Sequence, residues 1–211
     1  MNLEYYYWFF KSVIPKRLCE EIIQYGNSKT EIKALTGDKT EDDEISDEEI
    51  KKIEIKRKSH ITWLDENWVY KEIQPYIHKA NENAGWNFDL DWSESCQFTK
   101  YKEGQFYGWH SDSYPKPYND EKGKELEGKI RKLSMTVSLN DPNEYEGGNL
   151  EFDFRHRTDY EFTKSDKALC TEIRPQGSVI VFPSFVWHRV TPVTRGTRYS
   201  LVMWTCGQPF R

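Results

Sequence analysis

The sequence predicts a mainly β fold, a β-sandwich or jelly roll supported by helices on its amino-terminal side. Before Trp86, two stretches carry apolar residues at helical spacings of three and four. From Trp86 onward the apolar residues alternate with polar ones in short stretches, separated by turn signals such as Asp141-Pro142 and Gly147-Gly148. Helices followed by many short, regularly punctuated strands are typical of this fold class.

The amino-terminal part is expected to form one strand and two helices. Residues 3–10 read as a strand of bulky side chains, and residues 17–25 as a helix that ends at Gly26. Residues 66–84 form the second predicted helix. Because proline lacks an amide hydrogen, Pro75 predicts that this helix is kinked or broken into two pieces.

A strongly charged stretch separates the two predicted helices. Eight acidic residues fall within 38–49, and a basic run follows at 51–58. Like charges cannot form a core, so residues 36–56 are expected to be a solvated loop. Apolar alternation then resumes at residues 53–55 and 61–63, which predicts that the chain re-enters a sheet.

The second part of the chain reads as a series of short strands. They are expected at residues 86–92, 96–101, 132–139, 149–154, 169–173, 178–182 and 198–205. We find no internal repeat and no linker between two cores. The prediction is therefore one domain over 1–211, with strand and helix support in 1–92 and a jelly-roll core in 93–207.

Composition excludes several classes of protein. Apolar residues make up 36% of the chain and aromatic residues 15%, which a disordered protein would lack. A net charge of -5 argues against a general nucleic-acid binder. No apolar run is long enough to span a membrane, and the first fifteen residues do not resemble a secretory signal. With four widely spaced cysteines, these features predict a cytoplasmic monomer with reduced thiols that binds neither nucleic acid nor membrane.

Three residues are candidate metal ligands. In a strand, residues two apart point to the same face, so His110 and Asp112 can direct an imidazole and a carboxylate at one point. His188, just after an apolar strand, is the candidate third ligand. Two histidines and one carboxylate with open positions are typical of non-haem Fe(II) oxygenases. Zinc is the competing metal, although the helical HExxH pattern of many hydrolytic zinc sites is absent.

Arg198 supports the interpretation of these residues as a metal site with open positions. It begins the apolar strand 198–205, where a guanidinium is costly to bury unless it is paired. Its planar group suits a bidentate contact with a carboxylate. A metal with open positions and a deep arginine together predict a pocket for a dicarboxylate that chelates the metal at one end.

From Arg57 to Trp204 the chain resembles the Fe(II)/2-oxoglutarate-dependent dioxygenases, and within them the prolyl 4-hydroxylase-like branch. Residues 57–64 also resemble the strand before the core helix of oxygen-sensing prolyl hydroxylases. The matching motifs are Tyr101-x-x-Gly104-x-x-Tyr107-x-x-His110-x-Asp112, Leu139-Asn140, Tyr145-x-Gly147-Gly148-x-Leu150-x-Phe152, Pro183-Ser184, His188-x-Val190-x-Pro192-Val193 and Gly196-x-Arg198-Tyr199-Ser200.

The resemblance implies a fold and a role for each matching residue. The fold would be a double-stranded β-helix (jelly roll) core with the amino-terminal helices packed on one sheet. His110, Asp112 and His188 would hold Fe(II). Arg198 would pair with the distal carboxylate of 2-oxoglutarate, beside Tyr101.

Other matches carry less specific implications. Ser138 stands where some members use a tyrosine hydroxyl on the same carboxylate, so its shorter side chain departs from the pattern. Trp204 matches an aromatic wall of the substrate pocket, Arg131 an arginine near the substrate channel, and Arg57 a residue that touches substrate. A core tryptophan and a surface arginine are the alternatives for the first two.

The function that follows is hydroxylation of a C–H bond coupled to decarboxylation of 2-oxoglutarate to succinate, with ascorbate as a reductant. This chemistry requires no catalytic residue beyond the metal ligands. The expected substrate is a prolyl residue in a protein or peptide, over which residues 36–56 would close as a lid. The alternatives are a hydroxylase of a free amino acid or other small metabolite, and a non-catalytic jelly-roll module. Inert barrels have no physical reason to keep three converging ligands.

Overall fold

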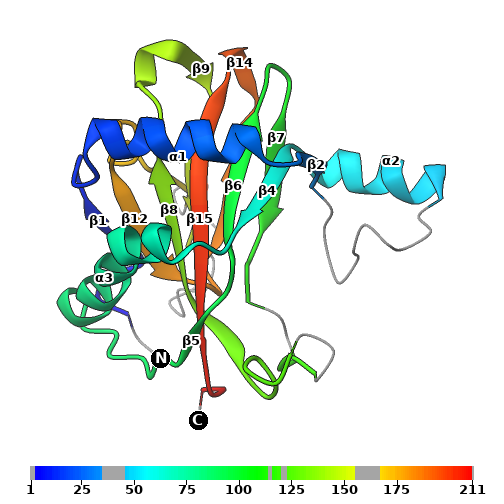
Figure 1. Cartoon of the computed structure of the whole chain (residues 1–211). Coiled ribbons are helices and arrows are strands. Elements are labelled where there is room, and N and C mark those ends of the chain that lie inside the picture. Colours follow the sequence, from blue (N-terminus) through cyan, green and yellow to red (C-terminus); the bar gives the residue numbers. More distant parts are fainter. Residues whose placement is uncertain (1–2, 35–45, 114–115, 120–122, 155–166, 211) are drawn as a thin grey trace.

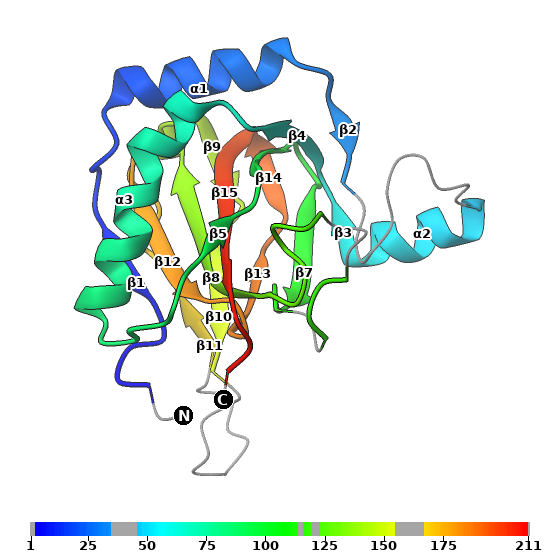
Figure 2. The same cartoon turned by 60° about the horizontal axis from the view of Figure 1, so that its bottom comes forward.

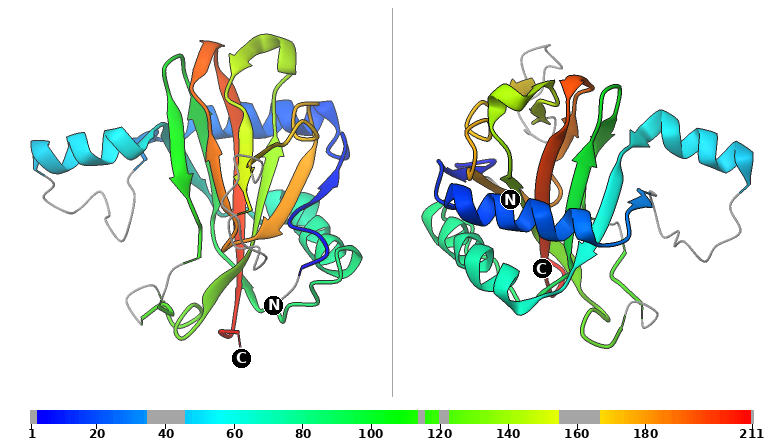
Figure 3. Two further views of the ribbon diagram at one scale, coloured as in Figure 1. Left: turned by 180° about the vertical axis from the view of Figure 1, so that it is seen from behind. Right: turned by 45° about the horizontal axis from the view of Figure 1, so that its top comes forward.

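A computed structural model describes residues 3–34, 46–113, 116–119, 123–154 and 167–210 of the chain. Two antiparallel sheets of very different size face each other and form its body (Figures 1 and 3). This is a mainly β architecture of the jelly-roll kind, as the alternating pattern predicts. None of the described helices combines the length and the apolar character that crossing a membrane requires.

The larger of the two sheets has eight strands. In spatial order they are β1 (Trp8–Phe10), β12 (Val179–Pro183), β8 (Ile130–Ser138), β15 (Arg198–Gly207), β6 (Cys96–Tyr101), β4 (His60–Leu64) and β2 (Ile32–Lys33), with β5 (Trp92–Ser93) paired to β15.

The smaller sheets complete the strands. The five-stranded sheet runs in the order β11 (Lys167–Leu169), β10 (Leu150–Asp153), β13 (Trp187–Val190), β7 (Phe106–His110) and β3 (Arg57–Lys58), and a ribbon pairs β14 (Val193–Gly196) with β9 (Tyr145–Gly147).

One face of the large sheet carries the main hydrophobic core. Two helices, α1 (Lys16–Ser28) and α3 (Asn67–Asn83), lie along this face (Figure 2). Buried side chains of both helices join one apolar cluster with alternate residues of β8 and β15, among them Ile22, Ile73, Val137 and Leu201. The opposite face of the large sheet is thereby left to face the small sheet.

Gly26 lies inside α1 and does not end it, contrary to the prediction. The helix continues to Ser28. A Cβ at position 26 would lie 2.5 Å from a ring carbon of Phe98, so the missing side chain allows the helix to approach the sheet. The glycine therefore serves close packing.

Residues 47–56 are a helix, which corrects the expectation of a charged loop over 36–56. This helix, α2 (Asp47–Lys56), begins with a capping box between Ser46 and Glu49. It includes residues 53–55, predicted as a strand, and projects from the body of the molecule (Figure 2). The rest of the proposed lid, residues 36–45, lies outside the described residues.

The helix α3 runs through Pro75 as one element, so the chain is not broken into two helices there, and the buried Ile73 and Ile77 hold it on the sheet at either side of the proline. The strand expected over residues 86–92 differs from the structure. Residues 86–91 do not form a strand. The Asn81 side-chain amide donates to the Phe88 carbonyl and accepts from its N–H, so these backbone groups are not available to a sheet.

Candidate metal centre

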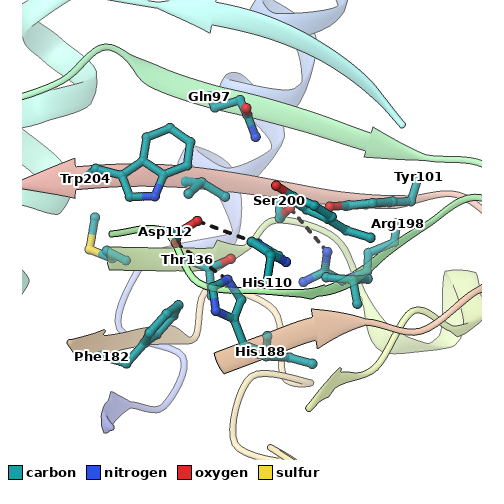
Figure 4. A pocket seen from close by; sticks show the side chains of 15 residues that line it. Gln97, Tyr101, His110, Asp112, Thr136, Phe182, His188, Arg198, Ser200 and Trp204 are labelled. Atoms are coloured by element: carbon teal, nitrogen blue, oxygen red, sulfur yellow. Dashed lines mark hydrogen bonds and ion pairs between the residues drawn. The ribbon is translucent and has the colours of Figure 1, made fainter. Parts of the chain in front are cut away.

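Two histidines and one aspartate converge where the small sheet faces the large one. His110 ends β7, and His188 is its register partner on the neighbouring strand β13. The Nε2 atom of His110 lies 3.6 Å from Asp112 Oδ1, and that of His188 lies 3.5 Å from Oδ2 (Figure 4). One ligand atom from each residue falls within 4.8 Å of the others, so a single cation can contact all three.

Asp112 reaches this point from outside the strand. The prediction placed it on the same strand face as His110, but β7 ends at His110. The chain then turns, because the N–H groups of Asp112 and Ser113 both donate to the Ser184 carbonyl, at 2.8 and 2.9 Å. The convergence of the two side chains therefore depends on this turn.

Both imidazoles are held in the orientation that a metal requires. His110 Nδ1 lies 2.8 Å from the Gly108 carbonyl and His188 Nδ1 lies 3.0 Å from the Val186 carbonyl. Because a carbonyl only accepts, each Nδ1 carries a proton, and this hydrogen bond directs the Nε2 atom of each ring toward the shared point. Burial, followed by the neighbouring His188, lowers the pKa of His110 to about 3, so its imidazole is neutral.

Asp112 is an ionised and oriented carboxylate. Burial alone would raise its pKa, but His188, His110 and Arg131 outweigh burial and lower the pKa to about 2. The Ser134 hydroxyl donates to Asp112 Oδ2 at 2.8 Å and lies 2.9 Å from the Ser184 hydroxyl. Fixed partners of this kind orient a ligand for its metal.

A stack of three flat groups supports His110 from the small sheet. The Tyr107 ring lies on the His110 imidazole, with centroids 3.5 Å apart and planes 12° from parallel. The Arg57 guanidinium lies 4.4 Å from the centre of the Tyr107 ring and donates to the Ser59 hydroxyl. Arg57 is buried and contacts Tyr107, and it does not line the pocket next to the histidines.

The triad opens into a pocket between the two sheets (Figure 4). It is lined by Gln97, Tyr101, Tyr107, His110, Asp112, Met135, Thr136, Leu150, Phe182, His188, Val190, Arg198, Ser200, Val202 and Trp204.

At one end of this pocket, Arg198 is only 2% exposed. It donates to the Ser200 hydroxyl at 3.3 Å and lies 5.5 Å from the centre of the Tyr101 ring. Among the described residues no carboxylate pairs with it. A buried guanidinium without an anion is costly, and so the pocket is suited to an anionic ligand.

The other predicted residues are distributed differently. Ser138 is buried on β8 but is not among the residues that line the pocket. Trp204 lines it, and Arg131 lies behind that ring, 3.9 Å from its centre. Arg131 forms two hydrogen bonds of 2.6 Å with Glu94, a partner that sequence reasoning missed because 37 residues separate them.

Sequence reasoning also missed Thr136 and Ser200 in the pocket wall. The signal was present. Thr136 is two residues from Ser138, which sequence reasoning singled out on β8, and Ser200 is two residues from Arg198 on β15. Residues two apart on a strand share a face, so the period-two rule places both beside the site.

The family model and the relatives that match this chain are all oxygenases or hydroxylases. The model of the 2OG-Fe(II) oxygenase superfamily matches residues 96–206. A PKHD-type hydroxylase of Xanthomonas axonopodis is 34% identical over 107 residues, which are 51% of this chain and 41% of the relative. A PKHD-type hydroxylase of Hyphomonas neptunium is 38% identical over 102 residues, 48% of this chain and 38% of the relative. The chain thus spans about two fifths of the length of these relatives.

Solved structures resemble the whole fold. A viral collagen prolyl hydroxylase of Paramecium Bursaria Chlorella virus-1, in complex with 2OG, has a TM-score of 0.63 at 20% identity and covers 97% of both chains. A prolyl hydroxylase of Trichoplax adhaerens, in complex with a hypoxia inducible factor peptide fragment, has a TM-score of 0.64 at 17% identity, covering 95% of this chain and 83% of that one. At such identities the likeness concerns the fold.

Proposed function

The chain belongs to the 2OG-Fe(II) oxygenase superfamily, and on that premise we propose that it hydroxylates a C–H bond of a prolyl residue in a protein or peptide. Fe(II) and 2-oxoglutarate are the cofactor and cosubstrate of this superfamily. The observation that carries the proposal is the joint presence in one pocket of an oriented His110–Asp112–His188 triad and a buried Arg198 that no carboxylate of the described residues pairs with.

The residues of the triad fit a ferrous ion. They offer two imidazole nitrogens and one carboxylate oxygen, and this set leaves further positions for exogenous ligands. The Nδ1 atoms of the two histidines donate to the Gly108 and Val186 carbonyls, and Oδ2 of the aspartate accepts from the Ser134 hydroxyl. Iron, when bound here with 2-oxoglutarate, supplies the oxidising chemistry, in which succinate and carbon dioxide are formed.

Arg198 would hold the distal carboxylate of 2-oxoglutarate. Its guanidinium is pre-oriented by Ser200 and Tyr101, so little freedom is lost when an anion binds. Leu150 and Val190 line the same pocket, and an apolar lining of this kind would strengthen the ion pair between Arg198 and the carboxylate. We assign no protein nucleophile and no acid–base pair, since the oxidising chemistry would be supplied by the bound metal and its cosubstrate.

The similar solved structures favour a prolyl substrate. The structures described above are prolyl hydroxylases, and one of them is in complex with a peptide. A free amino acid or another small metabolite is the competing substrate class.

The experiment is mass spectrometry of proline-containing peptides incubated with the protein, Fe(II), 2-oxoglutarate and ascorbate. We expect a gain of one oxygen on proline and a stoichiometric amount of succinate, both abolished in His110→Ala. Succinate formation that is stimulated by a free amino acid and by no peptide would instead support the metabolite hydroxylase. No succinate under any condition would refute the dioxygenase itself.

A further inference from the structure

Trp63 is an exposed aromatic side chain next to the pocket. It is 46% exposed, although it is among the largest apolar side chains of the protein. Its ring centre lies 6.3 Å from that of Trp204, which lines the pocket and is only 6% exposed. The two rings therefore form one aromatic surface that leads from the pocket out to solvent.

The strand register shows that Trp63 faces the pocket side of the large sheet. Trp63 on β4 is the partner of Gln97 on β6, and directly paired residues of antiparallel strands share a face. Gln97 lines the pocket. The next pair, Leu64 and Cys96, belongs to the core beneath the helices on the opposite face.

The Trp204 part of this surface is held rigidly. The Arg131 guanidinium covers one face of the ring and is itself fixed by its paired hydrogen bonds to Glu94. The indole Nε1 of Trp204 is buried beside Asp112, and the interaction of this N–H with the carboxylate contributes to the low pKa of Asp112.

We propose that Trp63 is a specificity-determining residue that contacts the part of a peptide substrate flanking the reacting residue. This inference rests on the proposed function and specifies its substrate class. An extended chain advances about 3.3 Å per residue, so a residue one or two positions from the reacting one spans the separation of Trp204 and Trp63. A metabolite confined to the pocket does not reach Trp63.

Physical chemistry favours this role for a tryptophan. The indole offers a large, flat contact area and has only two side-chain torsions to fix on binding. Tryptophan is also enriched among the residues that dominate binding at interfaces. A proline or another apolar side chain of the substrate would cover the exposed face of Trp63 and remove apolar surface from water.

Trp92 provides a matched control. It is 47% exposed and also lies on a strand paired within the large sheet, opposite Cys206 of β15. Unlike Trp63, it has no ring contact with Trp204 among the described residues. Trp92→Ala therefore removes the same kind of side chain at a closely similar exposure without removing the Trp63–Trp204 contact.

The experiment compares wild type, Trp63→Ala, Trp63→Phe and Trp92→Ala on two substrates. One is a 15-residue peptide with a central proline, selected from a library of varied flanking sequences, and the other is N-acetylprolinamide. We expect Trp63→Ala to raise KM for the peptide about tenfold, with kcat and the KM for 2-oxoglutarate within twofold. Trp63→Phe should retain most of the affinity, and the short substrate should not distinguish the variants.

A binding measurement separates this inference from the proposed function. Labelled library peptides are titrated into protein loaded with Mn(II) and 2-oxoglutarate, which permits binding without turnover. Weaker peptide binding by Trp63→Ala than by Trp92→Ala supports the contact between Trp63 and the peptide. If the peptide binds in this way but is not hydroxylated, only the proposed activity is overturned. Equal binding by these two variants, or no peptide binding by wild type, overturns the assignment of Trp63.

Discussion

Replacing Ser134 by alanine should weaken iron binding without disturbing the fold around it. The Ser134 hydroxyl is fully buried and donates to Asp112 Oδ2 at 2.8 Å. A hydrogen bond to a charged group contributes roughly 1.5–3 kcal/mol, and the carboxylate is only 8% exposed, so water cannot readily replace the donor. Since about 1.4 kcal/mol corresponds to a factor of ten, we expect the Kd for Fe(II) to rise about 10- to 100-fold.

The assay is anaerobic calorimetric titration of the metal-free protein with Fe(II). Ser138→Ala is the matched control, because Ser138 lies on the same strand, is 2% exposed and is separate from the pocket lining. Thermal unfolding of both metal-free variants establishes that each is folded. A Ser134→Ala Kd within twofold of wild type would refute the idea that this hydroxyl orients the ligand. An equal loss in Ser138→Ala would attribute the effect to the strand rather than to the contact.

Three further predictions follow from the geometry. Arg198→Ala should raise KM for 2-oxoglutarate at least tenfold in initial-rate assays and leave the affinity for Fe(II) unchanged, because the buried guanidinium has no other anion in the described structure. Arg198→Lys should restore part of the affinity for 2-oxoglutarate, since it keeps the positive charge without the planar group. Glu94→Ala removes the carboxylate that pairs with the buried Arg131 guanidinium, and we expect the free energy of unfolding in urea to fall by about 3–5 kcal/mol; an unchanged value would show that the pair is effectively solvated. Burial raises the pKa of all four thiols, that of Cys19 to about 11, so the thiolate is scarce at pH 8. An aromatic disulfide reagent should therefore label none of the thiols in the native protein and all of them in guanidinium, and rapid native labelling would contradict the buried placement.

The parts of the site that sequence could predict are those carried by local pattern. The strands β8 and β15 are visible as period-two alternation because one face is buried under helices while the other carries the pocket. Chelating residue types and their order in the chain identify His110, Asp112 and His188 as candidates, and the structure brings their ligand atoms together.

The parts that sequence could not predict depend on distant partners or on competition between local signals. The Glu94–Arg131 pair and the ring of Tyr107 on His110 become contacts only once the strands are aligned. In the helix α2, the high charge suggested a loop, although Ser46 and Glu49 form a capping box that favours a helix. A side-chain amide that replaces sheet hydrogen bonds, as in the stretch after α3, leaves no mark in the apolar pattern.

The pairing of His188 opposite His110 has a consequence for assembly of the small sheet. Slipping β13 against β7 by one residue would turn one imidazole to the far side of the sheet, since side chains alternate along a strand. A bound divalent ion would then lose a ligand, so the ion tolerates a single alignment of these strands. Bound iron would thus stabilise this strand alignment. Adding iron would raise the melting temperature of the protein as well as supply its oxidising chemistry.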